Sequence, residues 1–202
     1  AEAEALSGAV VTLLADVSVS STITINKDLT VNLNGYTLSG GNGTSSVFQV
    51  SGGATLVMDG SASGSTFIGQ LHMGVGADDN GNTILNGGTY RSTEDFPVLH
   101  VDGSCTNSNV TIENATVEST DNTGILLIGA GTHTITNSTI SGKTAVHLQS
   151  GRLTVGDSTL ASTAITHADY ANNDSGSNPT GDVVVVGSSA LSSKNPTLVL
   201  GR

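Results

Sequence analysis

The chain has 202 residues with 36 % apolar, 11 % charged and 3 % aromatic side chains, a length that suits one domain with a full core. Its 6 basic and 17 acidic residues give a net charge of -11, which excludes nucleic acid as a partner because such a surface must be basic. No apolar run approaches the length of a membrane span, and the single cysteine, Cys105, allows neither an internal disulfide nor a thiolate zinc site.

The first segment, residues 1–8, has the sequence AEAEALSG and contains helix formers. We expect it to form a short N-terminal cap. An uncovered first layer of a repetitive β fold would expose unpaired strand edges, and a cap prevents this.

Short runs rich in β-branched residues then recur along the chain and predict many short strands. The runs are TITI, VFQV, LHM, VLHV, ILLI and AVHL, starting at Thr22, Val47, Leu71, Val98, Ile125 and Ala145. About ten residues after each run comes a six-residue pattern: apolar, any, turn former, any, Thr-like, apolar. Its copies start at Leu33, Met58, Leu85, Ile112, Ile135 and Val155, so they lie 20 to 27 residues apart.

The third position of this pattern is always a residue that tolerates a left-handed backbone. The six residues at this position are Gly35, Gly60, Gly87, Asn114, Asn137 and Asp157. Glycine adopts a positive φ at little cost, and Asn and Asp are the side chains that tolerate it best. Each repeat is therefore predicted to turn a tight corner with φ > 0 between two short strands.

Three short strands per repeat, without helices between them, are typical of a parallel β-helix. We expect an all-β, single-stranded, right-handed solenoid of seven to eight coils, with residues 1–202 forming one domain. Residues 163–182 lengthen one coil by a loop excursion, which is either flexible decoration or a functional loop.

Residues 11–41, VTLLADVSVSSTITINKDLTVNLNGYTLSGG, resemble the β-helix repeats of bacterial surface proteins. The pattern as a whole resembles the right-handed parallel β-helices of the pectate-lyase-like superfamily. This resemblance implies an extracellular or cell-surface location. The resemblance concerns the architecture of the fold, and fold alone does not imply function.

The first strand of each repeat is predicted to stack on its neighbours into a flat sheet whose side chains alternate between core and solvent. We expect Ile128 and the corresponding residues of the other repeats to face the core. The outward column is then Thr24, Gln49, His72, His100, Leu127 and His147. Three of the five histidines share this column.

In the enzymes that the chain resembles, the substrate lies along such a face, near the loops that lead into it. The resemblance thus implies ligand contacts by Gln49, His72, His100 and His147. The loops would add Glu94, Asp95, Glu118 and Asp121, with Arg91 nearby. A sheet face of this composition is also common where nothing binds.

The acidic and amide side chains offer hard oxygen ligands, so any metal is predicted to be calcium. The candidate ligands are Asp78, Asp79 and Asn80 in one loop, with Asp95 and Asp121 in another. Solvated acidic residues at turns are the alternative interpretation, in which the chain needs no cofactor.

The sequence is compatible with three functions. The preferred one is a non-catalytic extracellular module with a structural, adhesive or glycan-contacting role, whose partner is a glycan or a host or cell surface. The alternative is a polysaccharide lyase or glycoside hydrolase with a reduced site, although the Gly-His-Gly and Arg-Ile-Lys motifs of the pectin hydrolases are absent. An ice-binding face would need a column of threonines, which the outward column does not provide. The sequence leaves the oligomeric state open.

Overall fold

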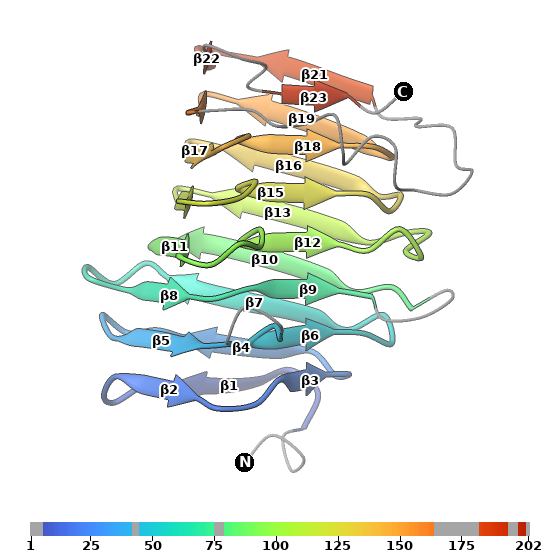
Figure 1. The fold of residues 1–202 in the computed structure, drawn as a ribbon. Coiled ribbons are helices and arrows are strands. Elements are labelled where there is room, and N and C mark those ends of the chain that lie inside the picture. Colours follow the sequence, from blue (N-terminus) through green and yellow to red (C-terminus); the bar gives the residue numbers. More distant parts are fainter. Residues whose placement is uncertain (1–5, 42–44, 75–78, 164–181, 194–197, 201–202) are drawn as a thin grey trace.

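The short apolar runs form strands, and each strand pairs in parallel with the equivalent strand of the next coil. The computed structural model describes residues 6–41, 45–74, 79–163, 182–193 and 198–200. It is an all-β, right-handed parallel β-helix, as predicted, with three flat sheets along one axis (Figure 1). No helix among the described residues could cross a bilayer.

Each complete coil contributes one strand to each of three sheets. Sheet A contains β1 (Ala9–Thr12), β4 (Leu29–Asn32), β7 (Thr55–Gly60), β10 (Asn82–Gly87), β13 (Asn109–Glu113), β16 (Thr132–Thr136), β19 (Arg152–Gly156) and β21 (Asp182–Val186). Sheet B contains β2 (Val17–Val19), β5 (Thr37–Gly40), β8 (Thr66–Ile68), β11 (Thr89–Ser92), β14 (Thr116–Ser119), β17 (Thr139–Gly142), β20 (Thr159–Ser162) and β22 (Ala190–Ser193). Sheet C contains β3 (Ile23–Ile25), β6 (Phe48–Val50), β9 (Leu71–Met73), β12 (Leu99–Val101), β15 (Ile125–Leu127), β18 (Val146–Leu148) and β23 (Leu198–Leu200).

Six consecutive coils, from β1 to β18, have all three strands, which is slightly fewer than the predicted seven to eight. The difference arises because β20 is not followed by a described sheet C strand, and β23 pairs directly with β18.

Residues 164–181 of the predicted loop excursion and residues 1–5 of the predicted cap lie outside the described residues. Within the rest of the cap, the Gly8 amide donates to the Asp28 carbonyl at 2.7 Å.

The core is narrow and is filled by side chains that alternate inward along each strand. In β7, Leu56 and Met58 are fully buried. Three aromatic side chains follow one another in the core. The rings of Phe48 and Phe67 are stacked with centroids 6.3 Å apart, and those of Phe67 and Tyr90 are tilted with centroids 6.2 Å apart. The Tyr90 hydroxyl donates to the Met58 carbonyl at 3.0 Å, so this buried polar atom is satisfied.

The corners between sheets A and B have the predicted left-handed backbone in five of the six repeats. The φ angles are 55° at Asn114, 48° at Asn137 and 48° at Asp157. Two consecutive residues have positive φ in two other coils, namely Asn34 with Gly35 and Gly87 with Gly88. Each of the three single-residue corners is held by the next coil, as when the Asn137 amide donates to the Gly156 carbonyl at 3.1 Å.

Gly60 is the exception, and the prediction of a positive φ there is wrong. It continues β7 in register with Gly87, and the positive φ between β7 and β8 lies at Gly64, where φ is 88°. A Cβ at position 60 would approach the Gly87 carbonyl oxygen to 2.8 Å and the Gly88 Cα to 2.9 Å. Glycine is therefore required at this position by the close approach of two coils and not by backbone handedness.

Buried serines connect the corners of successive coils. The Ser138 side chain accepts a hydrogen bond from the Ala115 amide at 3.1 Å, and its hydroxyl donates to the Thr136 carbonyl at 2.7 Å. Ser158 repeats this arrangement one coil later, where it accepts from the Ser138 amide at 3.1 Å. These side chains supply partners at the corner, where the regular strand pairing is interrupted.

One histidine lies inside the core. His133 of β16 is fully buried in register between Val110 and Leu153, and within the described part of the chain neither ring nitrogen has a hydrogen-bond partner. Burial lowers the pKa of His133 to about 4, because the charged imidazolium would lose its hydration.

The left-handed corner can be tested at the exposed Asn137. We expect Asn137→Ala to lower the free energy of unfolding by about 1 kcal/mol, because alanine tolerates a positive φ less well. Asn137→Gly is the matched control and should cost less, since glycine adopts this backbone freely. Urea unfolding of both variants measures the difference, and equal costs would contradict the role of backbone handedness.

The buried imidazole predicts a pH-dependent loss of stability. Between pH 6.5 and 4 the unfolded chain protonates His133 while the folded chain does not, so stability present above pH 6.5 is lost as the pH falls towards 4. The loss from this residue is about 2–3 kcal/mol. His133→Leu should remove that part of the pH dependence in urea unfolding measured at pH 7 and pH 4.5. An unchanged pH dependence in this variant would show that His133 does not cause it.

Candidate functional site

The strands of sheet C stack along the axis of the β-helix (Figure 1). The outer face of this sheet carries a column of polar residues. The strand register places Thr24 beside Gln49, Gln49 beside His72, and His72 beside His100. Parallel strands lie about 4.8 Å apart, so these side chains follow one another at that spacing. The predicted column is therefore present over β3, β6, β9 and β12.

The prediction shifts by one residue at β15. Leu126, and not Leu127, pairs with His100 and with His147, and Ile128 lies beyond the end of the strand. All three residues of β15 are buried. The run ILLI contains no polar residue that could set the phase of the alternation, which explains the error.

A compact group of three side chains occupies the centre of this face. We call His72, His100 and Asp102 the imidazole–carboxylate cluster. The two imidazole rings are stacked, with centroids 4.5 Å apart and planes 5° from parallel. Asp102 follows β12 directly and places its Oδ2 3.7 Å from His72 Nε2. The side chains of His72 and Asp102 are 22 % and 38 % exposed, so an external ligand can reach the cluster.

Backbone contacts hold the cluster in place. The Asp102 amide donates to the Met73 carbonyl at 2.9 Å, which attaches the end of β12 to the coil that carries His72. Oδ1 of Asp102 accepts a hydrogen bond from the Ser104 amide at 2.8 Å. This turn leaves Oδ2 directed toward the histidines.

Burial keeps both imidazoles neutral near pH 7. It lowers the pKa of His72, and Asp102 opposes this shift. Burial also lowers the pKa of His100 to about 4, with a smaller contribution from His72 in the same direction and one from Asp102 that opposes it. For Asp102, burial acts to raise the pKa, but the Ser104 hydrogen bond and the two histidines outweigh it and the pKa is lowered.

The third histidine of the predicted strip is not accessible. His147 pairs with Leu126 and Val199 in the register of sheet C, so it belongs to the column. Its side chain is fully buried, as is that of Leu126. The exposed part of the predicted ligand face is thus confined to the coils of Gln49, His72 and His100.

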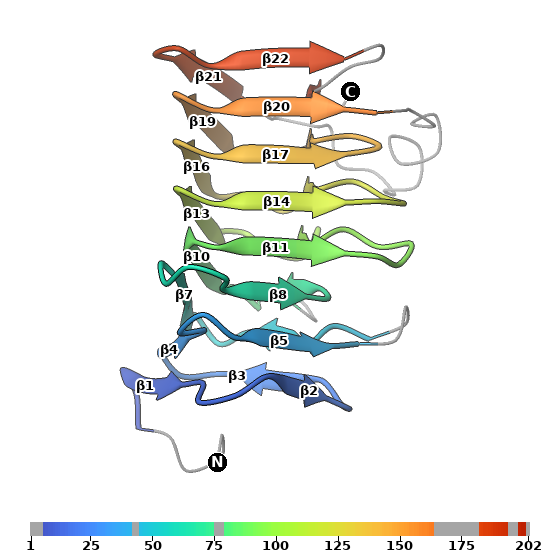
Figure 2. The same ribbon diagram turned by 90° about the vertical axis from the view of Figure 1, so that its left-hand side faces the viewer.

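The remaining predicted contact residues lie on sheet B or in the loops that connect sheet B to sheet C. Arg91 and Glu118 lie in register on sheet B, which faces the viewer in Figure 2, and form an ion pair at 2.8 Å. Asp95 accepts a hydrogen bond from Asn122 Nδ2 at 3.1 Å, which links two successive loops. Asp121 is exposed in the second of these loops.

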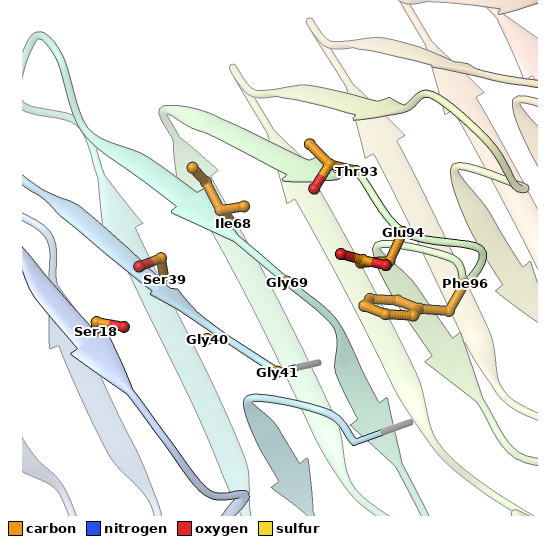
Figure 3. Close-up of a pocket in the computed structure, with 9 residues that line it drawn as sticks. All are labelled: Ser18, Ser39, Gly40, Gly41, Ile68, Gly69, Thr93, Glu94 and Phe96. Atoms are coloured by element: carbon orange, nitrogen blue, oxygen red, sulfur yellow. The ribbon is translucent and has the colours of Figure 1, made fainter. Parts of the chain in front are cut away.

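Glu94 lines a shallow depression of about 220 Å³ where sheet B meets the loops towards sheet C (Figure 3). Ser39, Ile68 and Phe96 also contribute to its wall. The volume lies below the roughly 300–1,000 Å³ of pockets that enclose a small-molecule ligand. This depression can hold at most a small group.

The oxygens predicted to bind calcium contribute to hydrogen bonds between coils. Asp79 Oδ1 accepts from the Gly52 amide at 2.7 Å. Asn80 Oδ1 accepts from the Thr106 and Asn107 amides at 2.9 and 2.8 Å. Asp78, the third predicted ligand, lies outside the described residues.

Asp102 is the cluster member that the sequence analysis missed. The signal was present, because His100 and Asp102 are separated by one buried residue, Val101, and a period of two places both on the same face. Following the alternation of outward-facing residues past His100 along its own strand predicts that Asp102 lies on the same face.

Comparisons with protein-family models, with curated proteins and with solved structures found no match to this chain.

The cluster predicts a coupled titration. Because Asp102 raises the pKa of both histidines, Asp102→Asn should lower the pKa of His72 and of His100 further. Asp121→Asn, which removes an exposed carboxylate from another loop, is the matched control and should leave both values unchanged. NMR titration of the imidazole signals measures the shifts, and an unmoved His72 would contradict the proximity of the carboxylate.

Proposed function

We propose that this chain is a non-catalytic, extracellular β-helix module of a bacterial surface or secreted protein, and that it contacts a glycan. The contact surface would be the exposed outer face of sheet C. The observation that carries the proposal is the regular column of Gln49, His72 and His100, with Asp102 beside it.

The spacing of the column suits a carbohydrate chain. A sugar ring spans about the 4.8 Å that separates parallel strands, so successive coils can offer hydrogen bonds to successive hydroxyl groups. Neutral imidazoles, an amide and a carboxylate provide both donors and acceptors. The resemblance to the pectate-lyase-like superfamily, whose members hold their substrates along such a face, supports the same choice.

The net charge of -11 argues for a neutral or basic glycan over a polyanion, since like charges repel. The acidic residues at the rim, Asp95 and Asp121, favour the same class. A host or cell-surface protein is the other partner class that this module could contact, and the binding assay distinguishes the two.

A reduced polysaccharide lyase or glycoside hydrolase is the second candidate. One observation favours it: the His72 imidazole lies 3.7 Å from the Asp102 carboxylate, an arrangement that can orient a general base. Depolymerisation of a polysaccharide by the purified chain would support this activity over binding alone.

The proposal is tested with a glycan array and with host-cell surfaces, in the presence of a chelator so that metal-dependent binding is excluded. We expect His72→Gln combined with Gln49→Ala to weaken glycan binding about tenfold or more, because each lost hydrogen bond contributes roughly 1 kcal/mol. Circular dichroism first establishes that the variant is folded.

The matched control is Arg91→Ala combined with Glu118→Ala, which alters an exposed pair on sheet B. We expect this control to bind as the parent does. Equal binding by both double variants would remove the outer face of sheet C as the contact surface, and binding to protein-only surfaces would replace the glycan by a protein partner.

A further inference from the structure

The imidazole–carboxylate cluster brings together three side chains of metal-ligating type. One ligand atom from each of His72, His100 and Asp102 lies within 4.8 Å of the others. Nε2 of His72 and Nε2 of His100 are buried and have no hydrogen-bond partner within the described residues. An imidazole nitrogen without a partner is costly in the interior, and a bound cation would satisfy it.

We propose that His72, His100 and Asp102 bind one divalent transition-metal ion, with zinc as the representative of the class. This site lies on the same face as the proposed glycan contact, but its existence does not depend on the proposed function. It also differs from the predicted calcium loop in position and in ligand type.

The ligand types select the metal. Imidazole nitrogen suits zinc, copper, nickel and cobalt, whereas calcium takes six to eight oxygen ligands. Two nitrogens and one carboxylate match the His-rich sites of zinc proteins. The cluster therefore favours zinc over calcium, which is the ion expected from the acidic composition of the chain.

The distances fit after a small adjustment. Zinc bonds of about 2.0–2.2 Å in a tetrahedral arrangement place neighbouring ligand atoms roughly 3.3–3.5 Å apart. His72 Nε2 and Asp102 Oδ2 are already at 3.7 Å. The nearly parallel rings hold their in-plane lone pairs in two parallel planes, so one ring has to turn before both can point at one ion. His72 has room for this motion because its side chain is 22 % exposed.

The backbone positions the ligands in advance. His72 and His100 occupy paired positions of β9 and β12, and Asp102 stands two residues beyond His100 on the same face. The Ser104 amide binds Oδ1 of Asp102 and leaves Oδ2 for the ion. Hydrogen bonds of this kind orient metal ligands and strengthen binding.

Three protein ligands leave at least one coordination position of zinc open. Asp102 is 38 % exposed, so the open position is accessible to solvent. Water or an oxygen of an external ligand would complete the coordination.

The test uses the full chain without an affinity tag, treated with a chelator and then dialysed. Calorimetric titration with Zn²⁺ should give one ion per chain. NMR should show the imidazole signals of His72 and His100 shifting with zinc, while those of His133 and His147 do not move. Co²⁺ should give a spectrum without thiolate charge-transfer bands, since Cys105 is not a ligand.

The ligand variants are His72→Gln, His100→Gln and Asp102→Asn. Glutamine already stands in this column at Gln49, and asparagine retains an acceptor for the Ser104 amide, so we expect all three to fold. Each should weaken zinc binding at least roughly tenfold. Gln49→Ala and Asp121→Asn are the matched controls and should bind zinc as the parent does.

Three results would overturn the proposal. The first is no saturable zinc binding by the parent chain. The second is undiminished binding by the three ligand variants, which would place the ion elsewhere. The third is displacement of zinc by equimolar Ca²⁺, which would assign the site to a hard cation. None of these measurements involves a glycan, so they leave the proposed function to its own test.

Discussion

The structure depends on the pairing of each coil's backbone amides with the coils above and below it. Within a sheet, neighbouring strands satisfy each other's backbone hydrogen-bonding groups. Between sheets the chain has to turn while its amides and carbonyls still find partners in the adjacent coils. The left-handed residues Asn114, Asn137 and Asp157 make the turn in a single step. Their amides donate to the next coil, and buried serines such as Ser138 supply the remaining partners. The three sheets consequently remain in register from coil to coil.

Because the strand register is constant from coil to coil, residues at equivalent positions line up in columns along the axis. The environment of each residue then depends on the residues above and below it in its column. In the core, the constant register brings Phe48, Phe67 and Tyr90 into ring contact. It also places His133 between apolar side chains, where the imidazole stays neutral near pH 7. Outside, it brings His72 and His100 into ring contact. The phase of a histidine in its strand therefore decides whether it points into the core, as His133 does, or towards the outer face of a sheet, as His72 and His100 do.

Local features of the fold were predictable, and features that depend on neighbouring coils were less so. Asn137 could be recognised from its own residue type, because a positive φ is a local requirement. Gly60 was misassigned because its lack of a side chain serves the approach of Gly87 and Gly88 from the next coil. The polar face was located correctly at Gln49, His72 and His100. The burial of His147 depends on what surrounds sheet C, which a pattern of alternation does not contain.

The stacking of coils also has a mechanical consequence. Strand pairing runs along the axis of the rod, while only one covalent connection joins each coil to the next. Tension applied between the two ends would therefore detach coils one at a time from an end, and each detachment would break the hydrogen bonds of a single layer. A coil that occupies about 4.8 Å of the rod contains 20 to 27 residues, which extend to roughly 70–90 Å of chain. The rod would lengthen in discrete steps under load and would absorb work at each one.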